Sequence, residues 1–418
     1  MNFVAAVEYL WGLGHETLTM KLGLRNTELL LDALDNPERA FPSVQIAGTN
    51  GKGSTAVMLD SIGRAAGIKV GLYTSPHLVS ITERIRVAGE AITPEEFAAC
   101  ATTVRNIAEQ LLRDKQIEAL PTFFEQLTVI ALLAFRNAGI ELAILETGLG
   151  GRLDSTTAAN ARIAGITQIA MDHEEYLGRT LESIASEKAA IIRPGVDAVI
   201  ARQTPEALAV LLKRCEETGV VPIVDDGHRT VETRTALLGR HQVDNAAVAI
   251  RLAEALKVHG FTIPHSAIVS GLDAVRHPGR LEMIEHEPAF LLDGAHNPAG
   301  CQSLRDYLDE FAPRPLTLVF GVMRDKRLDQ IGAILFPAAD VLILTPVDNP
   351  RSASIEMLRS TASRFARGVV IESNSSAHAL RIALERTPSE GLICIGGSLY
   401  LIGELRPLIL KMSLDKAT

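Results

Sequence analysis

A glycine-rich segment between an apolar strand and a helix carries the clearest chemical signal in the sequence. The run SVQIA at 43–47 leads into Gly48-Thr49-Asn50-Gly51-Lys52-Gly53-Ser54, and a helical pattern follows at once. Glycines let backbone N–H groups converge on an anion, the helix N-terminus favours negative charge, the lysine adds a cation, and a hydroxyl can reach Mg²⁺. The spacing departs from the general GxxxxGK(S/T) pattern because a glycine separates lysine from serine. The segment predicts a nucleotide phosphate site.

Three polar residues follow apolar strands and are candidate metal ligands. Glu146 ends the run LAILE, His173 follows the next strand beside Asp172, and Ser75 ends the run VGLYTS at 70–75. Open α/β sheets bind ligands at the carboxyl ends of their strands, and Mg²⁺ prefers oxygen ligands. A strand-end glutamate is more often a surface carboxylate, and a single histidine is more often an ordinary loop residue. The wider pattern must therefore decide between these alternatives.

Nine segments in a fixed order supply that wider pattern. They are GTNGKGS (48–54), YTSPHL (73–78), ERIRV (83–87), FFEQLT (123–128), LETGLGGRLDST (145–156), MDHEEYLG (171–178), SEKAAII (186–192), GRHQVDNAAVA (239–249) and LDGAHNPAG (292–300). The ordered set resembles the folylpolyglutamate synthase and dihydrofolate synthase family, a branch of the Mur ligase superfamily. It runs through both halves of the chain and is far more specific than any one segment.

The resemblance implies a set of site residues that bind ATP, Mg²⁺ as two ions, and the acyl substrate. The implied metal ligands are Ser75, Glu146 and His173. The implied ATP-binding residues are Gly48, Thr49, Asn50, Gly51, Lys52, Gly53, Ser54, Asn245, Arg280 and Asp293, and the implied catalytic residues are Lys52, Lys188 and His296. The implied lining of the pteroate pocket is Phe124, Glu125, Leu153, Asp154 and Ser155.

Lys188 has an unusual implied role. In this family and its Mur relatives the matching lysine is carbamylated by CO₂, which turns a cation into a carboxylate-like group that helps to organise the metal. An ammonium group is a poor neighbour for Mg²⁺, so the modification has physical logic. The sequence departs from the family pattern at Ala190, where glycine is common. The alternative is an exposed helix lysine paired with Glu187 or Glu182.

Two of the implied site segments also have structural interpretations. The helix that carries FFEQLTVIALLAF is mainly a core helix, so core packing is the alternative role for Phe124. An aromatic ring can equally stack on a flat heterocycle. Asn297-Pro298 is typical of a helix N-cap followed by proline in the first turn, a role that is compatible with a nearby His296 in the site.

Alternating strands and helices must position these residues. The first half predicts buried strands at 43–48, 70–75, 142–147 and 163–170, and helices at 53–66, 94–113 and 122–138. After about residue 285 the rhythm restarts with AFLLDG, TLVFGV, VLILTPV, GVVIES and LICIGG, each followed by a helical pattern. This predicts an α/β protein with two mostly parallel sheets.

The chain length and one turn-rich segment predict two domains. A chain of 418 residues exceeds one ordinary core, and the turn-forming stretch 277–280 contains a Pro-Gly pair. We expect an ATP-binding P-loop domain of the Mur ligase central type, with the pterin site, over residues 1–280. Residues 281–418 are expected to form a Rossmann-like glutamate ligase domain.

Composition excludes several classes of protein. A net charge of −9 without a dense lysine and arginine stripe argues against nucleic acid as a partner. The four cysteines are widely spaced, which favours buried, reduced thiols. The N-terminus does not read as a signal peptide, and no segment approaches a membrane span. We expect a cytoplasmic enzyme, and the family implies a monomer.

The implied reaction is ATP-dependent amide formation. A substrate carboxylate attacks the γ-phosphate of ATP to give an acyl phosphate, and the amine of L-glutamate then displaces phosphate. Three hypotheses remain open from the sequence. The first is a bifunctional enzyme acting on dihydropteroate and on reduced folates, or a monofunctional version of either activity. The second is a Mur-type ligase for another acyl substrate, and the third is a nucleotide-binding switch without ligation.

Overall fold

The computed structural model describes residues 1–14, 23–225 and 234–415. The chain divides into two compact units. The first contains residues 1–235 and 243–275, and the second contains residues 236–242 and 276–418. The sequence places the domain boundary after Arg280, whereas the division into compact units falls at Val275 and gives the short segment 236–242 to the second unit.

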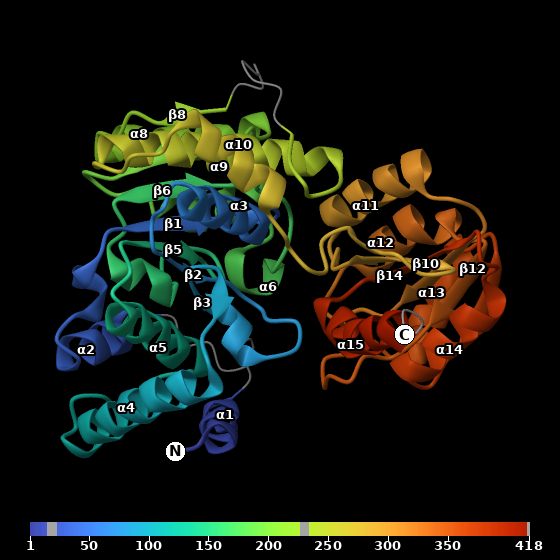
Figure 1. The fold of residues 1–418 in the computed structure, drawn as a ribbon, viewed down its shortest axis with the longest axis horizontal. Helices are drawn as coiled ribbons and strands as arrows, with labels where there is room; N and C mark the ends of the chain where they lie inside the picture. Colours follow the sequence, from blue (N-terminus) through green and yellow to red (C-terminus); the bar gives the residue numbers. More distant parts are fainter. Residues whose placement is uncertain (15–22, 226–233, 416–418) are drawn as a thin grey trace. The chain divides into compact units, whose positions relative to one another are not determined.

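The first unit is built on a mixed sheet that is mostly parallel. Its strands in the described residues are β1 (Ser43–Ala47), β2 (Val70–Tyr73), β3 (Ile85–Val87), β4 (Glu90–Ala91), β5 (Leu142–Glu146), β6 (Ile163–Ile166), β7 (Asp197–Ile200) and β8 (Ile223–Val224). Their spatial order is β4-β3-β2-β5-β1-β6-β7-β8, and the part from β3 to β6 can be followed upward in Figure 1. Among the described strands, β2 and β3 pair antiparallel, as do β3 and β4, and the other pairs are parallel. The strand β1, which precedes the glycine-rich loop, therefore lies between β5 and β6 in the buried centre.

Helices cover both faces of this sheet. They are α1 (Phe3–Gly12), α2 (Arg25–Ala33), α3 (Lys52–Ala65), α4 (Pro94–Arg113), α5 (Phe123–Ala138), α6 (Glu174–Leu177), α7 (Leu181–Ala189), α8 (Pro205–Thr218), α9 (Arg240–Val258) and α10 (His265–Ala274), with the 3₁₀ turns η1 (Pro37–Ala40), η2 (Ile81–Arg84) and η3 (Ser155–Ala159). One apolar cluster joins α1, α2, α4 and α5 to β2 and β5. Another joins α7 and α8 to β6 and β7.

The second unit contains a smaller sheet of the same kind. Its strands are β9 (Glu282–Ile284), β10 (Ala289–Asp293), β11 (Leu316–Phe320), β12 (Val341–Leu344), β13 (Val369–Glu372) and β14 (Leu392–Gly396), in the order β13-β12-β11-β14-β10-β9. Only β9 is antiparallel to its neighbour. Its helices are α11 (Pro298–Phe311), α12 (Leu328–Leu335), α13 (Ile355–Phe365), α14 (Ser376–Arg386) and α15 (Leu399–Asp415), with the 3₁₀ turn η4 (Phe336–Ala338).

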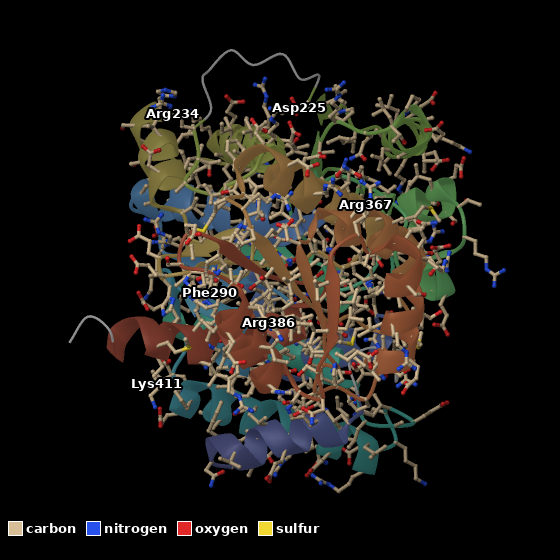
Figure 2. All side chains as sticks on the ribbon, turned by 90° about the vertical axis from the view of Figure 1, so that its right-hand side faces the viewer. Asp225, Arg234, Phe290, Arg367, Arg386 and Lys411 are labelled. Carbon is tan, nitrogen blue, oxygen red and sulfur yellow. The ribbon has the colours of Figure 1, made fainter. Side chains whose placement is uncertain are left out.

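Apolar side chains of the second unit are buried between its sheet and its helices. The cluster on one face of its sheet draws on α11, α12 and α13. In Figure 1, α11 and α12 lie on the side of the sheet opposite α14 and α15. Figure 2 shows Phe290 of β10 within the unit, where it is fully buried, whereas Arg386 of α14 and Lys411 of α15 are exposed. The alternation of apolar strands and amphipathic helices thus gives a three-layer arrangement.

The predicted two-domain α/β fold with mostly parallel sheets is confirmed. The strands and helices predicted from the sequence are present within one to four residues of their predicted ends; the largest difference is β6, which stops at Ile166 instead of residue 170. The short strands β3, β4, β7, β8 and β9 were not predicted. None of the described helices is long and apolar enough to span a membrane.

Candidate active site

The glycine-rich loop forms the turn between β1 and α3. Gly51 is the residue before the helix and has φ +86°, a conformation that disfavours other residues. No side chain caps α3, so the first-turn N–H groups of the helix are not used by a capping residue. Lys52 donates from Nζ to the carbonyl oxygens of Gly48 and Thr49, at 3.2 and 3.3 Å. The loop thus combines an uncapped helix N-terminus with a lysine folded back over it.

A second segment of the chain fixes the loop from the side. The N–H groups of Thr49 and Asn50 both donate to the carbonyl oxygen of Gln168, and the hydroxyl of Thr49 pairs with the backbone of Ala170. A Cβ on Gly48 would lie 1.9 Å from the Thr167 hydroxyl oxygen. The segment after β6 therefore holds the loop, a role that the sequence could not reveal because β1 and β6 are neighbours only in the folded sheet.

Asn245, which the resemblance assigns to ATP binding, lies beside this loop. A Cβ on Gly51 would lie 2.1 Å from Asn245 Oδ1, and the hydroxyl of Thr55 lies 3.5 Å from the Asn245 carbonyl oxygen. Asn245 is buried on α9, and Leu252 of the same helix packs against β6, where a Cβ on Gly165 would lie 3.1 Å from it. Residues almost 200 positions apart thus meet at the loop.

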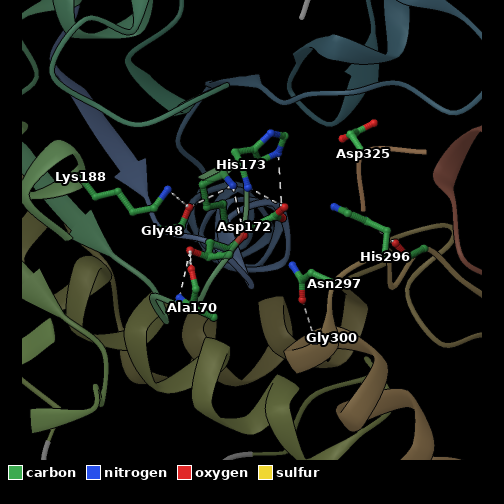
Figure 3. A network of polar contacts seen from close by, with 12 residues as sticks. Gly48, Ala170, Asp172, His173, Lys188, His296, Asn297, Gly300 and Asp325 are labelled. Carbon is green, nitrogen blue, oxygen red and sulfur yellow. Dashed lines mark hydrogen bonds and ion pairs between the residues drawn. The ribbon is translucent and has the colours of Figure 1, made fainter. Parts of the chain in front are cut away.

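Lys188 on α7 is buried and reaches the same loop. Its side chain is 4% exposed, and Nζ donates to the Gly48 carbonyl oxygen at 2.8 Å, a contact drawn in Figure 3. Burial and, to a smaller extent, the nearby Lys52 lower the pKa of Lys188, and Asp172 and Asp154 partly oppose them, so that the pKa is about 7. The alternative of an exposed lysine paired with Glu187 or Glu182 is therefore wrong.

The three candidate metal ligands lie at or beyond the carboxyl ends of β2, β5 and β6, of which β2 and β5 are neighbours and β6 is separated from β5 by β1. Glu146 is buried at the end of β5, and its Oε2 accepts the backbone N–H of Ser75 at 3.1 Å. His173 precedes α6 with φ +51°, and its Nε2 lies 3.9 Å from Asp172 Oδ2, as Figure 3 shows. Among the described residues, no three His, Cys, Asp or Glu side chains form a cluster that could hold a metal.

The residues implied for the acyl substrate divide into two kinds. Phe124 is half-buried against the core, with its ring 6.0 Å from that of Tyr73 and its edge against Gly148. Glu125 is buried and accepts the Thr122 N–H in a capping box that opens α5. Each residue thus has a structural role beside the one that the resemblance implies.

The segment 149–156 folds back onto the carboxylate of Asp154. Asp154 is buried and accepts hydrogen bonds from the N–H of Leu149 and from both the N–H and the hydroxyl of Thr156. Burial raises the pKa of Asp154, and these hydrogen bonds oppose the rise. Ser155 is buried beside it, whereas Leu153 is partly exposed.

In the second unit, Arg280, Asp293 and His296 gather at the end of β10. Asp293 accepts the N–H groups of Leu281 and Ala295, at 2.8 and 2.9 Å. A Cβ on Gly294 would lie 2.6 Å from Arg280 Nη1. His296 Nδ1 lies 2.8 Å from the Gly294 carbonyl oxygen. Because a carbonyl oxygen can only accept a hydrogen bond, Nδ1 carries a proton and donates it to this oxygen.

The next helix begins as the sequence predicted. Asn297 is the N-cap of α11, its side chain accepts the Gly300 N–H at 2.8 Å, and Pro298 occupies the first turn. The first turn of α11 is therefore capped by a residue of the loop that precedes it.

Comparisons with known proteins match both halves of the chain. The Mur ligase middle domain family matches residues 46–224, and the glutamate ligase domain of Mur ligases matches residues 279–399. A dihydrofolate synthase/folylpolyglutamate synthase from Bacillus subtilis is 33% identical over 95% of this chain and 97% of the relative. A folylpolyglutamate synthase from Lacticaseibacillus casei is 31% identical over 98% of this chain and 99% of the relative.

The chain spans about half the length of two other relatives. A probable bifunctional folylpolyglutamate synthase/dihydropteroate synthase from Haloferax volcanii is 34% identical over 97% of this chain but 50% of its own length. A relative with the same name from Halobacterium salinarum is 33% identical over 92% of this chain and 49% of its own length.

Solved structures share the fold over nearly the whole chain. The Mycobacterium tuberculosis folylpolyglutamate synthase complexed with ADP has a TM-score of 0.90 and 32% identity, over 97% of this chain and 99% of that chain. The Escherichia coli enzyme FolC with DHPP and ADP has a TM-score of 0.87 and 29% identity, over 99% of both chains. A bifunctional synthase with Mn, AMPPNP and L-glutamate bound has a TM-score of 0.85 and 28% identity, over 98% of both chains. The chain belongs to the folylpolyglutamate synthase and dihydrofolate synthase family of Mur ligases.

Proposed function

We propose that this chain is an ATP-dependent carbon–nitrogen ligase that activates a pteroate or folate carboxylate as an acyl phosphate and couples it to L-glutamate. The observation that carries the proposal is the meeting of Lys52 and Lys188 on the Gly48 carbonyl oxygen, beside an uncapped helix N-terminus. Phosphoryl transfer depends on fixed groups such as the Lys52 ammonium and the first-turn N–H groups of α3, because the protein contributes mainly positioning and electrostatics. Family membership makes an acyl substrate and glutamate the first ones to test.

The phosphate groups of ATP are proposed to bind at the start of α3. The segment Gly48–Ser54 supplies converging N–H groups, and Lys52 is free to exchange its two carbonyl partners in the loop for phosphate oxygens. Asn245 lies beside Gly51 and completes this side of the site. Arg280 and Asp293 of the second unit are retained as ATP-binding residues by resemblance, and His296 as a catalytic residue.

Ser75, Glu146 and His173 are proposed to hold Mg²⁺. A buried carboxylate, a hydroxyl and an imidazole are suitable ligands, and the hydrogen bond between Ser75 and Glu146 keeps the two side by side. A divalent ion there would offset the negative charge of the phosphates and the carboxylate during transfer. The related structures that contain Mn or a nucleotide support this choice of cofactors. The number of ions, expected to be two, is part of the proposal.

Carbamylation of Lys188 is proposed on the basis of its ionisation. CO₂ reacts with the neutral amine, and a pKa of about 7 makes a large fraction of this amine neutral near pH 7. The product would replace a second cation beside Lys52 with an anionic group. A mass spectrum of the intact protein in bicarbonate, acquired under conditions that preserve carbamates, should show one added CO₂, and a Lys188→Met variant should not. A wild-type spectrum with a free amine only would end the proposal.

The acyl substrate is proposed to lie between Phe124 and the segment Leu153–Ser155. Phe124 offers a half-buried ring for a flat heterocycle, and Leu153 offers partly exposed apolar surface. In the reaction, a carboxylate oxygen of the substrate bonds to the γ-phosphorus and ADP leaves. The nitrogen of L-glutamate then bonds to the carbonyl carbon, the phosphate leaves with the bonding pair, and the nitrogen loses a proton. No protein nucleophile is required.

The decisive experiment measures ADP release with Mg²⁺, L-glutamate and either dihydropteroate or a reduced folate, with products identified by mass. Activity with both acyl substrates supports a bifunctional enzyme, and activity with one supports a monofunctional enzyme. The Lys52→Met variant should reduce turnover by about 10³ without loss of fold, because within the described part of the chain the Lys52 ammonium donates to the loop carbonyl oxygens of Gly48 and Thr49. ADP release that does not depend on any acyl substrate would contradict the ligase proposal.

Two broader expectations accompany this proposal. The four cysteines are all free and buried, which supports an enzyme of a reducing compartment such as the cytoplasm. A monomer is expected from the family, and sedimentation of the purified chain would test it.

A further inference from the structure

Gln45 is a buried amide in the middle of β1. Its side chain is 0% exposed, and it lies between β5 and β6 in the centre of the first unit's sheet. Most residues in such a position are apolar, since a buried amide is costly unless it is hydrogen-bonded. Neither the nucleotide site nor the acyl site described above includes Gln45.

The amide donates both of its hydrogens to the turn η3. Nε2 lies 3.0 Å from the Thr156 hydroxyl oxygen and 2.7 Å from the Thr157 hydroxyl oxygen. The Thr156 hydroxyl donates to Asp154 Oδ1, and the Thr157 hydroxyl donates to the Gly151 carbonyl oxygen at 2.7 Å. Because both hydroxyl hydrogens are already used, Gln45 must present its NH₂ group and not its oxygen.

The orientation has a cost. Gln45 Oε1 is buried and has no hydrogen-bond partner within the described structure. Leaving a buried acceptor unpaired costs roughly 1–3 kcal/mol. Buried polar groups are nearly always hydrogen-bonded, so the unpaired oxygen needs an explanation. The explanation is that the NH₂ group must face the hydroxyl oxygens of Thr156 and Thr157.

The network ends on the segment 149–156, which contains the proposed acyl-substrate residues Leu153–Ser155. The Asp154 carboxylate accepts hydrogen bonds from the N–H groups of Leu149 and Thr156, so the segment 149–156 folds around this carboxylate. Asp154 is therefore committed to the loop itself. The same strand β1 enters the phosphate loop three residues after Gln45, at Gly48.

We propose that Gln45 is a positioning residue that sets the acyl-substrate segment 149–156 relative to the phosphate loop, acting through Thr156, Thr157 and Asp154. A single strand then carries the phosphate loop at its end and the anchor of the substrate loop in its middle. Errors of about 1 Å between reacting groups cost on the order of 10² in rate, so such an anchor matters for phosphoryl transfer to a carboxylate. The kinetic part of this inference rests on the proposed ligase function.

Matched variants separate positioning from simple stability. Gln45→Met keeps the side-chain length and removes both donors, and Thr156→Val keeps the shape of the threonine and removes its hydroxyl. Thr156→Ser keeps the hydroxyl and is the control. We expect Gln45→Met and Thr156→Val to raise the KM for the acyl substrate roughly tenfold, with the KM values for ATP and L-glutamate within about twofold of wild type. Thr156→Ser should match wild type.

Hydrogen exchange tests the loop without any substrate. In Gln45→Met and Thr156→Val, the N–H groups of Leu149 and Thr156 should exchange roughly tenfold faster, while those of α3 keep their wild-type rates. This measurement remains decisive if the wild-type chain shows no ligase activity, an outcome that would refute the proposed function alone.

Three outcomes would overturn the inference. One is unchanged exchange in the loop in both folded variants. Another is faster exchange in the loop with an unchanged KM for the acyl substrate in an active enzyme. The third is equal impairment of Thr156→Ser and Thr156→Val.

Discussion

Two loops in this molecule have the same topology and opposite chemistry. Each follows a strand that has a neighbour on both sides and opens a helix: residues 48–51 join β1 to α3, and residues 294–297 join β10 to α11. The first loop ends on Gly51, and no side chain caps the helix. The second ends on Asn297, whose side chain caps the helix, while Asp293 accepts two N–H groups of its own surroundings. One helix N-terminus has no side-chain cap and is the proposed site of an external anion, whereas the other has a cap from its own loop.

The difference shows what makes a helix N-terminus a binding site. Every helix has first-turn N–H groups that lack partners in the helix, and α11 uses them for its own stability. The helix α3 lacks a stabilising side-chain cap. Instead, Lys52 and Lys188 both donate to the Gly48 carbonyl oxygen in the loop before it. Changes in the first loop should therefore affect function, and changes in the second loop's cap should affect stability.

The largest effect is expected for Gly51→Ala. The new Cβ would lie 2.1 Å from Asn245 Oδ1 at a φ of +86°, so the loop must move. We expect ADP affinity to fall by at least about 100-fold, since displacements near 1 Å have effects of this size. Isothermal titration with ADP and Mg²⁺ measures it.

Gly67→Ala is the matched control for Gly51→Ala. Gly67 has φ +81°, and no atom lies within 4 Å of its added Cβ. This variant should lose only about 1–2 kcal/mol of stability from backbone strain, with unchanged ADP affinity. Equal losses of affinity in the two variants would mean that strain, and not the approach of Asn245, explains Gly51.

Lys188→Met probes the buried amine at the base of the first loop. The unfolded lysine keeps its proton up to about pH 10.4, whereas the folded one loses it near pH 7, so the unfolded state binds more protons between these values. The free energy of unfolding of the wild type should therefore rise with pH across this range and fall again as pH drops toward 7. Relative to that of the variant, the free energy of unfolding of the wild type should fall by a few kcal/mol as the pH is lowered from 10 to 7.

Denaturant unfolding in CO₂-free buffer at several pH values tests Lys188→Met. Carbon dioxide must be excluded because carbamylation would remove the titrating amine. Parallel curves for wild type and variant would show that Lys188 does not change its ionisation on folding.

Arg280→Ala tests a residue that packs against the second loop. The guanidinium lies against Gly294, and its implied contact is with ATP. We expect kcat/KM for ATP to fall by roughly tenfold to fiftyfold with little change in stability, because a charged hydrogen bond to a phosphate is lost. Arg367→Ala, at an exposed position of the same unit, is the control. Unchanged kinetics for Arg280→Ala would remove this residue from the site.

The sequence predicts local features of both loops for a physical reason. Gly51, Lys52 and the following helix are contiguous, so local geometry alone determines what they can bind. The alternation of apolar strands and helices likewise predicted both sheets, since burial on both faces leaves a plain apolar run. Asn297 was predicted as a cap for the same reason.

What the sequence could not give depends on strand order. The contact of Lys188 with Gly48, the support of the loop by residues 167–170 and the network of Gln45 all require β6 to lie beside β1. No periodicity reports which strands are neighbours. The burial of Lys188 was missed because a lysine on a short helix is most often exposed, and a family pattern predicted its importance without its environment.

The smallest effect is expected for Asn297→Ala, and it tests the comparison most directly. Loss of the cap leaves the Gly300 N–H without its side-chain acceptor and should cost about 1 kcal/mol, measured as a shift of the denaturant midpoint. Asn297→Asp keeps the acceptor and should retain most of the stability. ADP affinity should not change in either variant, because this helix N-terminus is closed by its own residue. If ADP affinity falls in Asn297→Ala but not in Asn297→Asp, the second loop also receives an anion, and the contrast between the two helix N-termini is one of degree.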